Sequence, residues 1–147
     1  MRSAILAFAL FLAAGSDPFS ASITYDGVSW KAKDALAVVE EESILVALAP
    51  FSFDRKAFAS DGVVDRVDLV EGTPLEQPLM ILEFDQEGIL RFVSHRTAEG
   101  ETSSQDDELL ASFTLETFDT KTIAGKLEYS SGKDKIELSF RLPMPGK

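Results

Sequence analysis

The stretch IAGKLEYSSGKDKIELSFRL, residues 123–142, decides the fold class of this chain. Apolar and polar residues alternate with a period of two on both sides of a short segment that contains Gly132. Successive side chains of a β-strand point to opposite faces, so the pattern predicts two strands with one buried and one solvated face. A turn that contains glycine joins them into a β-hairpin, and Pro143 and Pro145 end the pairing because proline has no N–H to donate.

Shorter apolar or alternating runs, separated by turn residues, precede this hairpin. The expected strands cover residues 23–25, 28–30, 35–40, 44–48, 63–70, 80–85, 89–93 and 111–116. Asp26-Gly27 is typical of a two-residue hairpin turn. In the run at 89–93, Leu90 and Phe92 should face one way and Arg91 the other. The run at 35–40 also suits a helix, but Val38-Val39 and the β-rich run at 44–48 favour a hairpin there. We expect about eight or nine short strands.

One short helix is predicted near residues 54–61, where Asp54 is a suitable N-cap and Gly62 ends the helical pattern. No long helical crossover is present to join parallel strands. The expected fold is therefore all-β, as an antiparallel β-sandwich or a small barrel. The polar residues 98–108 are expected to form an exposed acidic loop.

The first fifteen residues have the pattern of an export signal. Arg2 precedes an apolar run from Ala4 to Ala14, which is shorter than the roughly 20 residues that a membrane-spanning helix needs. We expect residues 1–15 to be removed, with cleavage as late as residue 22 as the alternative. The remaining chain, residues 16–147, would be a single β-rich domain that is secreted or periplasmic, without stable membrane insertion.

Composition excludes several function classes. The chain has 147 residues with 14 Lys and Arg against 25 Asp and Glu, a net charge of −11, whereas nucleic-acid binders need a concentrated basic face. It has no Cys, which excludes disulfides, thiol catalysis and Cys-ligated metals, and its one His argues against multi-histidine metal centres. An exported domain without disulfides must be stabilised by its apolar core. We expect no cofactor.

Trp30 and His95 are the two candidate binding residues. Histidine is a common general base, but the chain lacks a G-x-S-x-G motif, and a lone histidine at a strand end is usually a surface or half-buried residue. Tryptophan suits both binding hot spots and cores, and a core position is favoured here because Val28 would share its strand face. Glu83 and Asp85 form an acidic pair on one predicted strand face, which a solvated surface explains better than glycoside hydrolysis. We assign no catalytic residue.

Two acidic runs are considered separately. Asp106, Asp107 and Glu108 could supply oxygens to a calcium ion, but the EF-hand spacing is absent and a solvated acidic loop is the simpler interpretation. Residues 40–42, three consecutive glutamates, are interpreted as a hairpin turn whose charge prevents edge-to-edge aggregation.

Together these features predict an exported, acidic, non-enzymatic β-domain that acts as a binding protein or as an inhibitor or immunity-type protein. A basic exported protein is the expected partner, because opposite charges accelerate association. Two alternatives stay open. One is a small exported hydrolase that uses His95 or an acidic pair, and the other is an accessory subunit of a cell-envelope assembly that pairs through an edge strand.

Overall fold

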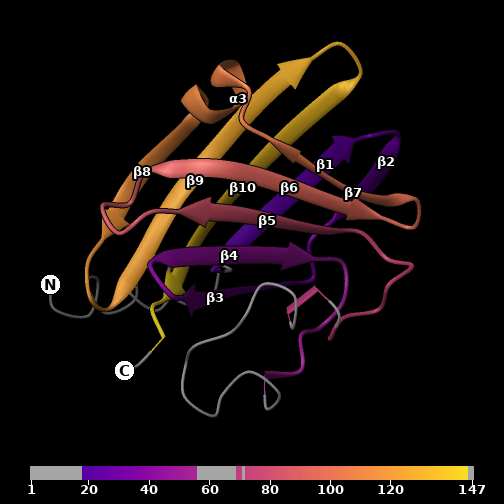
Figure 1. The fold of residues 1–147 in the computed structure, drawn as a ribbon. Helices are drawn as coiled ribbons and strands as arrows, with labels where there is room; N and C mark the ends of the chain where they lie inside the picture. The colour runs from indigo at the N-terminus through magenta and orange to yellow at the C-terminus, as the bar shows by residue number, and fades with distance from the viewer. Residues whose placement is uncertain (1–17, 56–68, 71, 146–147) are drawn as a thin grey trace, which may run out of the picture.

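The computed structural model describes residues 18–55, 69–70 and 72–145. The strands are β1 (Phe19–Tyr25), β2 (Val28–Lys31), β3 (Asp34–Glu40), β4 (Ser43–Ala49), β5 (Leu79–Phe84), β6 (Leu90–Thr97), β7 (Gly100–Ser104), β8 (Phe113–Phe118), β9 (Thr122–Ser131) and β10 (Asp134–Pro143). They form two antiparallel five-stranded sheets that pack as a β-sandwich, so the predicted fold class is confirmed (Figure 1). Sheet A has the order β2-β1-β10-β9-β8, and sheet B has the order β3-β4-β5-β6-β7.

The C-terminal hairpin has the alternation that its sequence predicts. Along β10, Ile136, Leu138, Phe140 and Leu142 are buried, whereas the residues between them are exposed. Strands β9 and β10 pair over their full length, and β10 also pairs with β1, so this hairpin lies at the centre of sheet A. One face of sheet A therefore packs on the core and the other faces solvent, as is common in antiparallel sheets.

Sheet B is buried on both faces at its central strands, β4 and β5. Residues 50–78 connect these strands, and the described part of this β4–β5 connection packs on the outer face of the sheet. The resulting second apolar cluster has the buried residues Val38, Leu45, Ala47, Ala49, Phe53, Leu69, Leu79 and Ile81. Strands covered on both sides read as continuous apolar runs rather than as alternation, which explains the sequences of β4 and β5.

Arg96 holds the end of the β4–β5 connection against sheet B. Its guanidinium donates hydrogen bonds to the carbonyl oxygens of Val70, Pro74 and Gln77 at 2.8–2.9 Å and to Thr73 Oγ1 at 2.6 Å. Only 5% of Arg96 is exposed. A planar group with several donors can satisfy these carbonyls together, so one side chain fixes a segment of irregular backbone.

The prediction that Leu90 and Phe92 share a face is wrong. The register between β5 and β6 shifts, so that Phe84 pairs with Leu90 while Glu83 pairs with Phe92. Leu90 and Val93 both belong to the core between the sheets. The extra residue of this β-bulge reverses the alternation and places Phe92 on the outer face beside Glu83.

The predicted acidic loop at residues 98–108 is also wrong in part. Residues 100–104 form the edge strand β7, which pairs with β6, and a short helix, α3 (Asp107–Ala111), follows it. The open edge of β6 supplies the ladder of backbone hydrogen bonds, so tertiary pairing outweighs the low β-propensity of this polar sequence.

Three further expectations fall largely on residues that the structure does not describe. The signal sequence at 1–15 lies outside the described residues, as does most of the helix expected near 54–61, of which Asp54 is not helical and Arg55 adopts a 3₁₀ conformation. Of the strand expected at 63–70, only residues 69–70 are described, and they are helical, so the prediction is wrong there. Within the described ranges, no helix combines the length and the apolar character needed to cross a membrane.

Candidate functional site

Trp30 and His95 contact each other inside the sandwich. Trp30 Nε1 donates a hydrogen bond to His95 Nε2 at 3.0 Å, and the two rings lie nearly parallel with centroids 6.1 Å apart. Trp30 comes from β2 and His95 from β6, so the contact joins sheet A to sheet B. Trp30 has the core position that was favoured. His95 is fully buried rather than at the surface, because β6 continues to Thr97 and pairs there with β7.

The partners of His95 define its tautomer. An indole N–H is only a donor, so Nε2 of His95 must accept, and the ring proton lies on Nδ1, which donates to Asp26 Oδ2 at 3.3 Å. The same carboxylate oxygen accepts from Thr102 Oγ1 at 2.8 Å. Burial lowers the pKa of His95 below its ordinary value, although Asp26 opposes this effect. Both ring nitrogens are therefore engaged and the imidazole is neutral, which suits a structural role.

The three acidic residues considered for calcium lie at the start of α3. Asp106 is the N-cap, and its Oδ1 accepts from the backbone N–H of Glu108 at 3.0 Å. Asp107 and Glu108 occupy the first helical turn, where negative charge is favourable. Across the part of the chain that the structure describes, no group of three or more His, Asp or Glu is placed to hold a metal ion. Helix initiation is thus sufficient to explain these residues.

The acidic pair is engaged in local structure. Asp85 follows β5 in the turn, where its Oδ1 accepts from the backbone N–H groups of Glu87 and Ile89, and its Oδ2 lies 2.8 Å from Arg91 Nη2. The hydrogen bond from Ile89 is the largest of the effects that lower the pKa of Asp85. Glu83 Oε2 accepts from Ser43 Oγ at 3.4 Å. The contacts of Asp85 stabilise the β5–β6 turn, and the contact of Glu83 joins β5 to β4.

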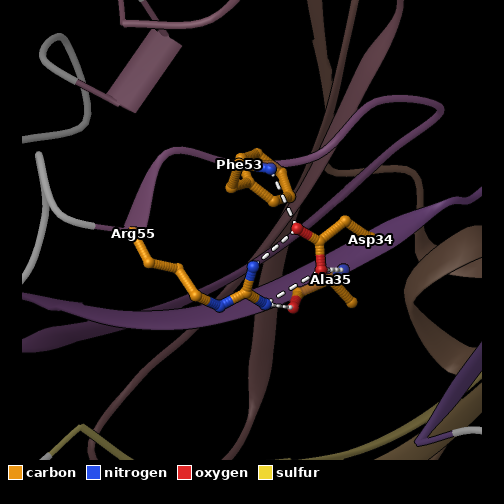
Figure 2. A network of polar contacts seen from close by, with 4 residues as sticks. All are labelled: Asp34, Ala35, Phe53 and Arg55. Carbon is orange, nitrogen blue, oxygen red and sulfur yellow. Dashed lines mark hydrogen bonds and ion pairs between the residues drawn. The ribbon is translucent and has the colours of Figure 1, made fainter.

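A second polar network joins the start of β3 to the β4–β5 connection (Figure 2). Asp34 accepts from the backbone N–H of Phe53 at 2.8 Å and from both terminal nitrogens of Arg55 at 2.6 and 2.9 Å. Arg55 also donates to the carbonyl of Ala35. Desolvation opposes ionisation of Asp34, but the hydrogen bonds from Arg55, Phe53 and Ala35 outweigh it and lower its pKa. The network fixes the first residues of the connection against the edge of sheet B.

A hollow of about 730 Å³ opens at one end of the sandwich. The arrowheads of β3, β5 and β8 point toward this end, at the left of Figure 1, and the turns that follow these strands surround it. We call it the end hollow. Its apolar wall consists of Val39, Ile44, Phe118, Met144 and Pro145. Its charged lining residues in the described structure are all acidic: Glu41, Glu42 and Asp119.

The turns around the end hollow are held by their own hydrogen bonds. Asp119 Oδ1 accepts from the backbone N–H groups of Lys121 at 2.8 Å and Thr122 at 2.9 Å, and these bonds lower the pKa of Asp119. Met144 N–H donates to the carbonyl of Lys121, which fixes the residues after β10 to the same turn. Glu41 has φ +48°, in the left-handed region that glutamate rarely adopts. The turn that carries Asp119 is therefore fixed in place, and this carboxylate keeps its charge to a lower pH than an ordinary aspartate does.

The solvated face of sheet A has a different charge pattern. Lys126 lies 3.9 Å from Glu128, and Lys135 lies 3.0 Å from Glu137, so charges of both signs stand in pairs. A smaller hollow of about 230 Å³ on this face is lined by Lys126, Glu128 and Glu137 together. This face carries a mixed charge, whereas the charged residues that line the end hollow are all acidic, with Lys121 and Arg141 close enough to Asp119 to lower its pKa.

The sequence gives little sign of the end hollow. Residues 40–42 and 119–120 read as two separate turns, and only the packing of sheet A on sheet B brings them around one opening. Asp26 likewise has the sequence context of a hairpin-turn residue, and no local pattern indicates its contact with His95. The acidic residues of the β3–β4 and β8–β9 turns are the one sequence signal of a shared site.

Comparisons with known proteins found no match for this chain among protein-family models, curated proteins or solved structures. A β-sandwich supports many unrelated functions, so the fold class alone indicates none of them.

Proposed function

We propose that this chain is an exported, acidic, non-enzymatic binding protein of the inhibitor or immunity type, directed at a basic protein partner. The end hollow is the observation that carries the proposal, because it combines an apolar wall with a rim of Glu41, Glu42 and Asp119. A partner surface that bears Lys or Arg beside apolar side chains would gain both apolar burial and charge complementarity there.

The overall charge supports the same partner class. A formal net charge of −11 attracts a basic protein from a distance and raises the rate of encounter. On the solvated face of sheet A, lysines stand beside glutamates, which reduces the local field. The three carboxylates that line the end hollow would therefore orient an approaching partner toward that end, although Lys121 and Arg141 near Asp119 offset part of their charge.

The pairing of the first residues of β1 bears on the choice between the two expected cleavage sites. Phe19 to Ser22 pair with β10, from Phe19↔Phe140 to Ser22↔Glu137. Cleavage after residue 15 would leave this strand intact, whereas cleavage at residue 22 would remove its first four residues. We therefore favour the earlier site and a secreted or periplasmic chain.

The hydrolase alternative loses its main candidates. His95 is buried with both nitrogens hydrogen-bonded, and Asp85 is engaged by two backbone N–H groups and Arg91. A general base must reach the proton that it removes, and neither His95 nor Asp85 lines the end hollow. This favours a binding role.

The test is to purify the chain from an expressing culture in its natural processing state, sequence its N-terminus, and use it as bait on the secreted and envelope fractions. We expect a basic partner whose association rate falls at least about tenfold between low and about 0.5 M salt, because screening weakens attraction between exposed charges. An acidic partner, a rate that ignores salt, or no stoichiometric partner would contradict the proposal.

A further inference from the structure

We infer that the end hollow receives one apolar side chain from a polypeptide segment that carries Lys or Arg on both sides of that side chain. This inference rests on the proposed function and names the part of the partner that binds. The volume of about 730 Å³ lies within the usual range for pockets that hold a whole small ligand, so it can take the anchor side chain together with parts of the residues on either side of it.

Apolar surface continues from the end hollow to Leu115 on β8. Ile89 and Leu115 are two of only three exposed large apolar side chains among the described residues. A Cβ atom added at Gly88 would lie 3.0 Å from the Phe118 ring and 3.1 Å from Leu115 Cδ2, so these two side chains pack beside the same turn. Exposed apolar surface next to a pocket is typical of a binding site.

The end hollow lies at the ends of two edge strands, which favours a polypeptide over a small molecule. Val39 lies on β3, one of the two edge strands of sheet B, and Phe118 lies on β8, one of the two edge strands of sheet A. In the described structure each of these strands pairs with a neighbour on one side only. An extended segment in the end hollow could therefore hydrogen-bond to edge backbone groups, which a small apolar cation could not do.

The acidic residues approach the end hollow from both sheets. Glu41 and Glu42 belong to the β3–β4 turn of sheet B, and Asp119 belongs to the β8–β9 turn of sheet A. An anchor held between the sheets would thus have carboxylates on two sides, which is the reason for expecting basic residues before and after it. Because these turns are already ordered, little conformational entropy is lost on binding.

The experiment is an NMR titration of the isotope-labelled chain with the capped peptide Lys-Lys-Leu-Lys-Lys. Two peptides serve as controls: Lys-Lys-Ser-Lys-Lys keeps the charge without the anchor, and Glu-Glu-Leu-Glu-Glu keeps the anchor with the opposite charge. We expect the first peptide to bind at least about tenfold more tightly than either control. Its amide shift changes should centre on Ser43, Gln86 and Thr120, which line the end hollow.

Two charge-reversal variants separate the end hollow from general attraction. The double variant Glu41→Lys/Glu42→Lys should weaken binding of the leucine peptide at least about tenfold. The matched variant Glu128→Lys/Glu137→Lys makes the same change in net charge on the solvated face of sheet A and should change binding less than about threefold. Leu115→Ser, at an exposed position, should weaken the leucine peptide and leave the serine peptide unchanged.

Equal binding of the leucine and serine peptides, equal loss in the two charge-reversal variants, or shift changes centred elsewhere would overturn the inference. So would hexylammonium chloride binding as tightly as the leucine peptide, since that would indicate a small-molecule site. A basic captured partner with salt-dependent association would leave the proposed function standing in each of these cases. Conversely, tight binding of the leucine peptide together with an acidic captured partner would support the peptide site and contradict the proposed function.

Discussion

Trp30 Nε1 donates a hydrogen bond of 3.0 Å to His95 Nε2 across the interior, although the two residues are 65 positions apart in the chain. The other ring nitrogen of His95, Nδ1, donates to Asp26, whose carboxylate also accepts from Thr102 Oγ1. Tyr25 packs edge-on against the same imidazole at 5.5 Å. A polar chain that begins at the buried Trp30 and His95 and ends at the exposed Asp26 and Thr102, with a partner for every member, favours one arrangement of the two sheets over others.

Stability should decrease as the pH falls from about 7 toward 5, because of His95. Burial lowers its pKa in the folded chain, so below the ordinary value of about 6.5 the unfolded chain binds a proton that the folded chain does not. The contribution is therefore complete above about pH 6.5 and is lost as the pH falls toward the lower, folded pKa. Urea unfolding at several pH values, followed by the fluorescence of the single tryptophan, measures the slope.

His95→Gln is the control for this pH dependence. Its side-chain oxygen can still accept from Trp30, but it does not titrate, so its stability should be nearly constant between pH 7 and 5. The carboxylates with lowered pKa values, Asp34, Asp85 and Asp119, lose their contributions only as the pH falls through about 4 and below. An equal slope in wild type and variant would contradict the assignment to His95.

Asp34→Ala should destabilise the fold more than Arg55→Ala does. Loss of the carboxylate leaves the buried N–H of Phe53 without its acceptor and should lower the free energy of unfolding by about 2–3 kcal/mol. The Arg55 side chain is 53% exposed, so its removal should cost about 1 kcal/mol or less. Chemical denaturation gives the stabilities, and amide hydrogen exchange at Phe53 reports the local effect. Equal costs would mean that the ion pair, rather than the backbone hydrogen bond, is the main contribution.

Gly125→Ala should be strongly destabilising for its size. A Cβ atom at Gly125 would collide with the Phe113 ring and lie 2.8 Å from the carbonyl oxygen of Thr114. Phe113 stacks on Phe140 in the core, so it has little room to move, and we expect a loss of about 1–3 kcal/mol. Phe113→Leu should recover part of this loss in the double variant. Ser139→Ala, on the solvated face, should change stability by less than about 0.5 kcal/mol.

Glu41→Gly should leave stability unchanged or raise it. The left-handed conformation of Glu41 costs an ordinary residue about 1–2 kcal/mol, whereas glycine adopts it freely and loses about 0.5–1 kcal/mol through greater freedom in the unfolded chain. Glu41→Ala removes the same carboxylate but keeps the strain, so it should be the less stable of the two. Thermal unfolding compares them, and a lower melting temperature for the glycine variant would contradict strain at this turn.

Much of the strand order was predictable where one face of a strand meets water. The alternation in β10 and the Asp26-Gly27 turn between β1 and β2 are both confirmed. Strand β5 is harder to predict from its sequence. The β4–β5 connection buries its outer face, so apolar residues also occupy the positions that would be polar on a solvated face. The bulge opposite Phe84 and the pairing of β7 with β6 depend on neighbouring strands, so no local sequence pattern predicts them.

The candidate sites were predictable only as residue types. Trp30 and His95 stood out because each is the single residue of its kind. That they bond to each other follows from where β2 and β6 cross in the packed sandwich. Asp119, Glu41 and Glu42 were predictable as charged turn residues. That they line the same end hollow depends on how the two sheets pack.

By itself, the sequence determined the all-β class, the main hairpins and the acidic balance, because periodicity, turn chemistry and charge are local properties of the chain. Only the tertiary structure decided that His95 is buried against Trp30 and that Glu41 and Asp119 line the same end hollow. The physical reason is that both arrangements result from packing sheet A on sheet B. That packing is selected by burial of the whole apolar core rather than by any segment of the sequence.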